Sequence, residues 1–352
     1  MESQRNDDSA NTDHKTKVCP LCGYLGNEST CPLDGERMVR AAKDESPTVP
    51  MEWDEGIVQP MSGYGEWPQP RVGDQPERGL CGQILDGRFE VGDELGRGGM
   101  GRVYEAFQPT VERTVAIKVL SRGFSDNPDA VKRFHREARA ASRLVHPNTI
   151  SIHDFGTSNG WLYMVMERLR GEDLADTLAS EGPLEPTRAV TIALQVARAL
   201  SAAHAQGVIH RDLKPANVFL CNLDGRADFV KVLDFGVAKI VTEGHDAAQV
   251  TQAGSFFGTP QYMAPEQASE ATVDGRADIY ALGVLLYEMC MGRPPFRGEN
   301  PLHVMLAQSR DSPPRFEDIR PDFEGPPELE SIVFQALSKA PDERQASASV
   351  ME

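Results

Sequence analysis

The sequence predicts an α+β fold in which a β-rich half precedes a mainly helical half. Two observations predict this order. Short apolar segments rich in β-branched residues follow one another in the first half, and apolar residues recur at helical spacing over long stretches of the second. Hydrophobic residues make up 40% of the 352 residues, which is enough apolar material for a sizeable core, so the bulk of the chain should fold.

The β-rich half should contain an antiparallel sheet interrupted by one helix. We expect its strands at Phe89–Leu95, Gly101–Phe107 and Thr114–Leu120, the last of which is almost entirely apolar and β-branched. The helix is expected over Ala130–Leu144, where apolar residues repeat at helical spacing until the chain reaches Pro147.

The helical half begins after Gly171, with its strongest helices expected at Pro186–Gln206 and Ala277–Met291. The second of these contains the longest apolar stretch of the chain, but it is shorter than the roughly 20 residues that cross a bilayer, so it predicts a buried helix. Between the two helices, the pair Asp224-Gly225 separates apolar segments and indicates a β-hairpin.

Composition divides the chain into four regions. The sequence predicts a disordered N-terminus at 1–17, a cysteine-containing module at 18–40, a Pro/Gly-rich linker at 41–85 and a globular domain at 86–352. The sequence stops at RQASASVME, and we expect that it is a piece of a longer protein.

Charge and cysteine usage narrow the class of protein. A net charge of -17 excludes a non-specific nucleic-acid binder, because the phosphate backbone would repel such a surface. The N-terminus lacks the apolar segment of a secretory signal, and six cysteines in 352 residues do not resemble a secreted disulfide framework. We therefore expect a cytoplasmic protein with no membrane segment in this chain.

A glycine-rich loop is the first functional signal. Gly96, Gly98 and Gly101 stand in a G-x-G-x-x-G-x-V arrangement, and such glycines let backbone N–H groups approach phosphate oxygens. A Rossmann fingerprint shares the spacing but opens a helix, and a Walker A loop continues with Lys-Ser or Lys-Thr. The residues after the glycines fit neither the Rossmann nor the Walker A pattern. Taken alone, the loop could still be an ordinary glycine-rich hairpin that binds no phosphate.

Charged residues that suit phosphate and metal binding follow in order. Lys118, in VAIK on the next predicted strand, could pair with the phosphates and with a helix carboxylate, for which Glu137 is the obvious candidate. Asp234, in VKVLDFG, offers a carboxylate that would bridge Mg²⁺ to the β- and γ-phosphates. For any one of these residues alone, a solvated surface charge would be the simpler interpretation, but their joint occurrence argues against it.

The segment HRDLKPAN supplies the remaining chemistry. Asp212 would orient the substrate hydroxyl and accept its proton, Lys214 can neutralise the moving phosphoryl group, and Asn217 is placed to bind a metal.

This ordered set of motifs resembles the eukaryotic-like protein serine/threonine kinases, and the resemblance covers roughly Asp86 to Glu352. It implies a bilobal protein kinase fold with a five-stranded N-lobe that carries one helix, a hinge near Glu167–Leu169 and a helical C-lobe. ATP would lie between the lobes. The alternative is a pseudokinase scaffold, which the intact motif residues disfavour.

The resemblance also implies a nucleotide pocket. Met166 corresponds to the gatekeeper, the hinge backbone would bind adenine, and Asp173 would reach the ribose. The implied cofactors are ATP and Mg²⁺, or Mn²⁺ in its place. The implied ATP-binding residues are Leu95, Gly96, Gly98, Gly101, Val103, Ala116, Lys118, Glu167, Leu169, Asp173 and Phe219.

Serine/threonine preference follows from the same resemblance. Lys214, two residues after Asp212, is the serine/threonine pattern, and Thr259 in GTPQY corresponds to the threonine that bridges these two residues. The motif sequences HRDLKPANVFL, DFGVAK and GTPQYMAPEQ are typical of bacterial members of the family. The family resemblance implies that the substrates are proteins and that the chain self-associates for autophosphorylation.

Control by phosphorylation is expected from Arg211, which precedes Asp212. A guanidinium beside the catalytic loop favours an anionic partner, and a phosphothreonine would supply one. Thr251 and Ser255 are the expected acceptors, and Lys239 could complete the basic pocket. The alternative is a loop whose hydroxyls are only solvated.

The cysteine cluster has the appearance of a zinc ribbon. Cys19, Cys22, Cys31 and Asp34 would supply thiolate and carboxylate ligands, with His14 as a rival for the fourth position. The alternatives are a redox C-x-x-C pair and a disordered tail. Such a small module has almost no core, so a metal would have to hold it together.

Overall fold

A computed structural model describes residues 17–18, 25–26, 29, 39–40, 79–98, 101–120, 127–223, 225–235, 260–268, 273–298 and 300–352. The chain divides into two compact units, 1–80 and 81–352. The described residues of the first unit include three two-residue strands, β1 (Lys17–Val18), β2 (Leu25–Gly26) and β3 (Val39–Arg40). They form an antiparallel sheet in the order β2-β1-β3.

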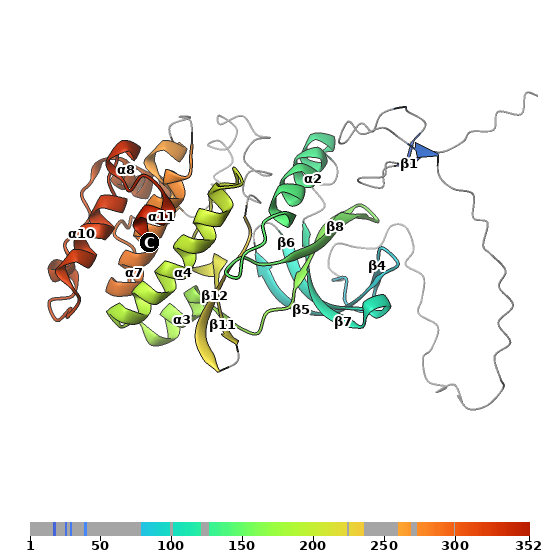
Figure 1. Cartoon of the computed structure of the whole chain (residues 1–352), viewed down its shortest axis with the longest axis horizontal. Helices are drawn as coiled ribbons and strands as arrows, with labels where there is room; N and C mark the ends of the chain where they lie inside the picture. Colours follow the sequence, from blue (N-terminus) through green and yellow to red (C-terminus); the bar gives the residue numbers. More distant parts are fainter. Residues whose placement is uncertain are drawn as a thin grey trace, which may run out of the picture. The chain divides into compact units, whose positions relative to one another are not determined.

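In its described residues, the second unit begins with a six-stranded antiparallel sheet and a helix, shown in cyan to green in Figure 1. Its strand order is β4-β5-β6-β7-β9-β8. The bounds are β4 Ile84–Leu85, β5 Phe89–Gly98, β6 Gly101–Gln108, β7 Arg113–Leu120, β8 Ile152–Ser158, β9 Trp161–Glu167 and α2 Pro128–Ser142, with a 3-10 turn, η1, at Pro109–Val111. The three strands expected in the first half are present, each within a few residues of its predicted bounds.

The sheet has one strand more than the five that the family resemblance implied. The additional strand β4 pairs with β5 and lies before the expected boundary at Asp86, so the end of the predicted linker is part of the sheet. A side-chain network fixes this edge: Arg88 donates to Asp154 at 2.7 Å and to Tyr163 at 3.0 Å, and Tyr163 donates to Asp86 at 2.7 Å. These partners are distant in sequence, so no local pattern could predict the strand.

Helix α2 begins two residues before its expected start because of its cap. The side chain of Asn127 accepts hydrogen bonds from the backbone of Asp129 at 2.9 Å and Ala130 at 3.2 Å, and Pro128 occupies the first helical position. Phe134 and Ala138, each 1% exposed, anchor the helix in a small core beneath the sheet.

The helical lobe follows, in yellow-green to red in Figure 1, and contains the longest helices of the described chain. Its strands are β10 Gly171–Asp173, β11 Val218–Leu223 and β12 Arg226–Val232. Its helices are α3 Leu174–Glu181, α4 Pro186–His204, α7 Arg276–Met291, α8 Pro301–Arg310, α9 Phe316–Ile319, α10 Pro327–Ala336 and α11 Ala348–Met351, with short 3-10 turns η2 Pro215–Asn217, η3 Pro260–Tyr262, η4 Pro265–Ala268 and η5 Pro341–Glu343.

Two predictions for this lobe are confirmed. Helix α7 is buried along almost its whole length, as its apolar sequence predicted, and Gly283 lets α10 approach closely, since a Cβ there would lie 2.7 Å from the Cβ of Ala336. The Asp224-Gly225 pair lies between β11 and β12, whose last register pair is Leu223 with Arg226. No helix in the described ranges is long and apolar enough to span a membrane.

Candidate active site

The glycine-rich loop forms the hairpin between β5 and β6. Gly96 pairs with Val103 and Gly98 pairs with Gly101 in the strand register. Gly101 has a φ of 157°, and a Cβ at this position would lie 2.0 Å from the carbonyl oxygen of Val119 on β7. Only glycine lets the two backbones approach this closely. At Gly96 and Gly98, by contrast, a Cβ would meet no atom within 4 Å, so the space beside the hairpin is open.

Strand register brings together the residues expected around the nucleotide base. Ala116 on β7 pairs with Met166 on β9, and these side chains are 6% and 7% exposed. In the other lobe, Asp173 on β10 pairs with Phe219 on β11. Asp173 also caps α3 by accepting a hydrogen bond from the backbone of Asp176 at 3.0 Å, and its burial raises the pKa of its carboxyl group.

The hinge residue Glu167 has a partner that the sequence did not reveal. Its Oε1 accepts hydrogen bonds from the backbone of Ser151 at 2.7 Å and from the ammonium of Lys231 at 2.8 Å. Burial alone would raise the pKa of Glu167, but Lys231 and Ser151 outweigh it and lower the pKa. Lys231 comes from β12 in the helical lobe. The sequence around Lys231, VKVLDFG, does not predict this contact, because the alternation of apolar and polar residues along a strand does not indicate which residue a side chain will contact.

The ammonium of Lys118 lies 2.6 Å from Asp234 Oδ2. Burial alone would raise the pKa of Asp234, but Lys118 outweighs it, so the pKa of this carboxyl group is lowered. The resemblance implied a pair between Lys118 and Glu137. In the described part of the chain that pair is not formed: Lys118 binds the partly buried carboxylate of Asp234, and Arg136 contacts Glu137 at 3.0 Å.

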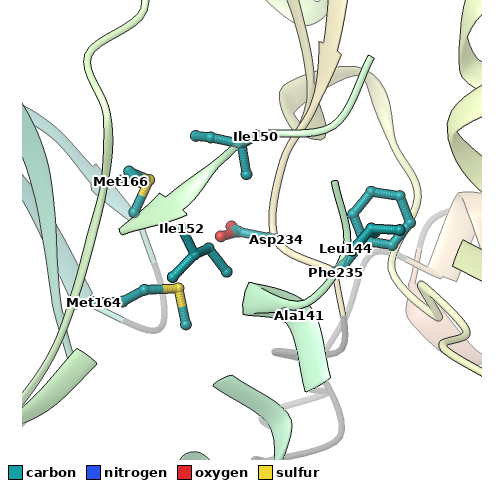
Figure 2. A pocket seen from close by; sticks show the side chains of 8 residues that line it. All are labelled: Ala141, Leu144, Ile150, Ile152, Met164, Met166, Asp234 and Phe235. Carbon is teal, nitrogen blue, oxygen red and sulfur yellow. The ribbon is translucent and has the colours of Figure 1, made fainter. Parts of the chain in front are cut away.

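A small cavity of about 10 Å³ lies behind this ion pair, room for about one water molecule. Figure 2 shows the carboxylate of Asp234 directed towards the side with Met164 and Met166, and the ring of Phe235 on the opposite side. Apart from Asp234 all its lining side chains are apolar. They are Ala141, Leu144, Ile150, Ile152, Met164, Met166 and Phe235.

The catalytic loop holds three predicted residues within hydrogen-bond distance. Lys214 Nζ lies 2.7 Å from Asp212 Oδ2, and Asn217 Nδ2 donates to the backbone oxygen of Asp212 at 2.7 Å and to its Oδ2 at 3.3 Å. Asp212 therefore has one carboxylate oxygen engaged with a cation and an amide. The Asp212 side chain is 16% exposed, so most of it is covered by its neighbours.

The backbone of this loop is held by a buried carboxylate. Asp278 on α7 is 1% exposed and accepts from the backbone N–H groups of His210 at 2.8 Å and Arg211 at 2.9 Å. His204 contacts the same carboxylate at 2.8 Å. Arg211 has a φ of 67°, a strained conformation for a residue with a side chain, and these bonds hold it there. Asp278 therefore supports this loop from the buried helix α7.

Leu233 joins the catalytic loop to Asp234. Its N–H donates to the backbone oxygen of Asn217 at 2.9 Å, and its carbonyl accepts from His210 Nε2 at 2.8 Å. His210 Nδ1 accepts from the backbone of Asp212 at 3.3 Å. The imidazole of His210 therefore donates at Nε2 and accepts at Nδ1. By these two bonds it helps to fix the distance between the carboxylates of Asp212 and Asp234.

The donor set fits a hard divalent cation such as Mg²⁺. Lys118 engages Oδ2 of Asp234, which leaves Oδ1, and Asn217 donates through Nδ2, which leaves its amide oxygen. Carboxylate and amide oxygens together with substrate phosphates are the ligands that Mg²⁺ prefers.

Several predicted site residues lie outside the described residues. They are Thr259 of the substrate platform, Lys239, Thr251 and Ser255 of the regulatory prediction, and Cys19, Cys22, Cys31 and Asp34 of the zinc prediction.

Comparison with known proteins agrees with this architecture. The family model described as protein kinase domain matches residues 89–352. The crystal structure of the Mycobacterium tuberculosis PknI kinase domain superposes with a TM-score of 0.60 and 31% identity, over 77% of this chain and 97% of that one. Rad53 1-466 in complex with AMP-PNP gives a TM-score of 0.61 and 26% identity, over 75% of this chain and 64% of that one. The chain therefore belongs to the protein kinase family.

Curated relatives refine the class. Serine/threonine-protein kinase pkn3 of Myxococcus xanthus is 43% identical over 272 residues, which are 77% of this chain and 50% of that protein. PknB of Mycolicibacterium smegmatis is 40% identical over 273 residues, 76% of this chain and 42% of that protein. The kinase domain is of the bacterial serine/threonine type, and the chain spans half the length or less of these two relatives.

Proposed function

We propose that this chain transfers the γ-phosphoryl group of ATP to serine and threonine hydroxyls of proteins in bacterial signalling. The observation that carries the proposal is the setting of Asp212, which contacts Lys214 and Asn217 and is tied through Leu233 to the Lys118–Asp234 pair. A carboxylate for the hydroxyl proton and cations for the phosphates are what phosphoryl transfer requires. The kinship with bacterial serine/threonine kinases supports the same activity.

Each charged group has a role in this reaction. Oδ2 of Asp212 accepts from Lys214 and Asn217, so Oδ1 would orient the substrate hydroxyl and accept its proton. Lys214 would neutralise charge on the phosphoryl group in transit, and Lys118 would bind the non-transferred phosphates. Asp234 and Asn217 would hold Mg²⁺, or Mn²⁺ in its place, which supplies charge neutralisation at the phosphate oxygens.

The nucleotide would be held by the glycine hairpin and the hinge. Backbone N–H groups of the hairpin would approach the phosphates, the backbone of Glu167 and Leu169 would bind adenine, and Asp173 would reach the ribose. Hydrophobic contacts to the ring would come from Leu95, Val103, Ala116 and Phe219.

Phosphate transfer from labelled ATP tests the proposal. We expect incorporation into the chain itself and into a generic basic protein, and its loss in Asp212→Asn, which keeps the size of the side chain but removes the proton acceptor. A pseudokinase scaffold would bind ATP yet give equal, background incorporation in both proteins, and that outcome would reject the proposed activity.

Preference for serine and threonine rests on Lys214 and on Thr259. A bridge from Thr259 to Asp212 and Lys214 would shape a platform too shallow for a tyrosine ring. Peptides that differ only in carrying serine, threonine or tyrosine at the acceptor position test this preference. Equal rates on tyrosine would contradict it.

Activation by autophosphorylation is proposed from Arg211. Its backbone is held by Asp278, and its guanidinium would bind a phosphate on Thr251 or Ser255, with Lys239 completing the pocket. Mass spectrometry should find phosphate on these residues in the wild type and not in Asp212→Asn. If self-association is needed, the rate per molecule should rise with protein concentration. Wild-type turnover by Thr251→Ala/Ser255→Ala would exclude the switch.

A zinc ribbon is proposed for residues 18–40. Strand β1 pairs with both β2 and β3. In sequence, Cys19 and Cys22 lie between β1 and β2, and Cys31 and Asp34 lie between β2 and β3, which is the order of two knuckles. Metal analysis of protein purified without chelator should find about one zinc per chain, lost in Cys19→Ser/Cys22→Ser. Absence of zinc would favour the alternative that residues 18–40 belong to a disordered, cysteine-containing tail. The free thiols Cys221 and Cys290 fit the expected cytoplasmic location.

A further inference from the structure

A buried glutamine contacts the segment that follows Thr259. Gln308 lies on α8, is 2% exposed and is, with Val304, one of two buried side chains of that helix. Its Nε2 donates to the carbonyl oxygen of Pro260 at 3.2 Å and to that of Gln261 at 2.5 Å. We call residues 260–264 the platform segment, since they lie between Thr259 and the buried Glu266.

Two further side chains extend this contact into a relay. Tyr280 on α7, which is fully buried, donates its hydroxyl proton to Gln308 Oε1. Lys339, which follows α10, donates to the hydroxyl oxygen of Tyr280 at 3.3 Å, and its Nζ lies 4.1 Å from the centroid of the Phe296 ring. The three helices gather in the orange to red part of the lobe in Figure 1.

The direction of every hydrogen bond in the relay is determined. The two carbonyl oxygens only accept, so the amide nitrogen of Gln308 must face them and its oxygen must face Tyr280. The hydroxyl of Tyr280 donates its one proton to that oxygen, with the backbone oxygen of Gln308 farther away at 3.5 Å, so its own oxygen accepts from Lys339, which only donates. If Gln308 contributed only packing volume, its amide would not need to direct Nε2 to the platform segment and Oε1 to Tyr280.

We propose that Gln308 is a positioning residue for the protein substrate: held by Tyr280 and Lys339, it fixes the platform segment and thereby the affinity for the protein, and not for ATP. The inference rests on the proposed kinase function. The relay shares no residue with the Lys118–Asp234 pair or with the Asp212 loop, which have their own supports in Asp278 and Leu233. Loss of the relay should therefore weaken the use of the protein substrate and leave the use of ATP unchanged.

The test compares Gln308→Leu with Gln335→Glu, whose side chain is exposed on α10. Initial rates are measured while a generic basic protein and ATP are varied in turn. Losing the two donations should lower kcat/KM for the protein about tenfold, while the KM for ATP stays within about twofold, because no contact to the nucleotide site changes. An unchanged kcat/KM for the protein, or an equal rise in both KM values, would overturn the inference.

A second variant separates positioning from stability. Gln308→Leu removes the nearer acceptor of the Tyr280 hydroxyl and leaves it only the Gln308 backbone oxygen at 3.5 Å, so Tyr280→Phe/Gln308→Leu should unfold at a higher temperature than the single variant. The weak use of the protein substrate should persist in the double variant, since the two donations from Gln308 to the platform segment are still missing. Recovery of substrate use together with stability would assign Gln308 a purely structural role and overturn the inference.

Hydrogen exchange makes the test independent of the proposed function. Backbone amides of residues 261–264 in the platform segment should exchange faster in Gln308→Leu than in Gln335→Glu, whether or not phosphate is transferred. Faster exchange in a chain whose wild type transfers no phosphate would reject kinase activity and keep the positioning role. Equal exchange in the two variants would overturn the positioning role even in an active kinase.

Discussion

Removal of the Glu266 carboxylate should destabilise the helical lobe more than any surface change. Glu266 is 8% exposed, and its partner Arg344 has a fully buried guanidinium. Arg344 uses all five of its N–H donors: two go to Glu266, at 2.7 and 2.8 Å, and the others go to the backbone oxygens of Arg276, Ser338 and Lys339. Glu266→Ala would leave this cation buried and uncompensated.

Breaking such a buried pair from one side costs about 3–5 kcal/mol, a large share of a domain stability of about 5–15 kcal/mol. Urea unfolding followed by circular dichroism measures the loss. Asp342→Ala is the matched control, because it removes a 92% exposed partner of Arg276 nearby and should cost at most about 1 kcal/mol. A loss in Glu266→Ala no larger than in the control would refute the reasoning.

Three further outcomes are expected. Lys118→Ala or Asp234→Ala should lower phosphate transfer at least about 10²-fold while circular dichroism stays unchanged, because each removes charge and not core packing; transfer at the wild-type rate would exclude these residues from the site. Lys231→Met should raise the KM for ATP several-fold and Lys231→Arg should restore it, since Glu167 would otherwise lack its cation at the hinge; an unchanged KM would show that the hinge does not depend on the pair. Burial lowers the pKa of Lys339 to about 8 from 10.5, so between pH 8 and pH 10.5 the unfolded chain binds a proton that the native state has released. The free energy of unfolding in urea should therefore rise with pH over this range more steeply in the wild type than in Lys339→Met. An equal pH dependence in the two proteins would contradict the shift.

The elements that sequence reasoning located are those with strong local signals. The strand over Arg113–Leu120 and the buried helix α7 carry apolar patterns that few other structures satisfy. The bounds were less certain, since the start of α2 depends on the side chain of Asn127 and not on its apolar residues. Strand β4 escaped prediction because two residues carry no periodicity.

The candidate site divides in the same way. The spacing within HRDLKPAN already requires Asp212, Lys214 and Asn217 to lie close together, since they occupy one short loop. The spacing could not determine which carboxylate Lys118 meets. That choice depends on how α2 and the segment of Asp234 pack, and in this structure Asp234 is the partner.

By itself, the sequence determined which chemical groups this protein possesses and the order in which they occur, because motifs are local and their residues are neighbours along the chain. Only the tertiary structure decided the partnerships of Glu167 with Lys231, Gln308 with Tyr280, and Arg344 with Glu266. The physical reason is that buried polar groups must find partners wherever packing brings them, and packing joins residues that no spacing rule connects.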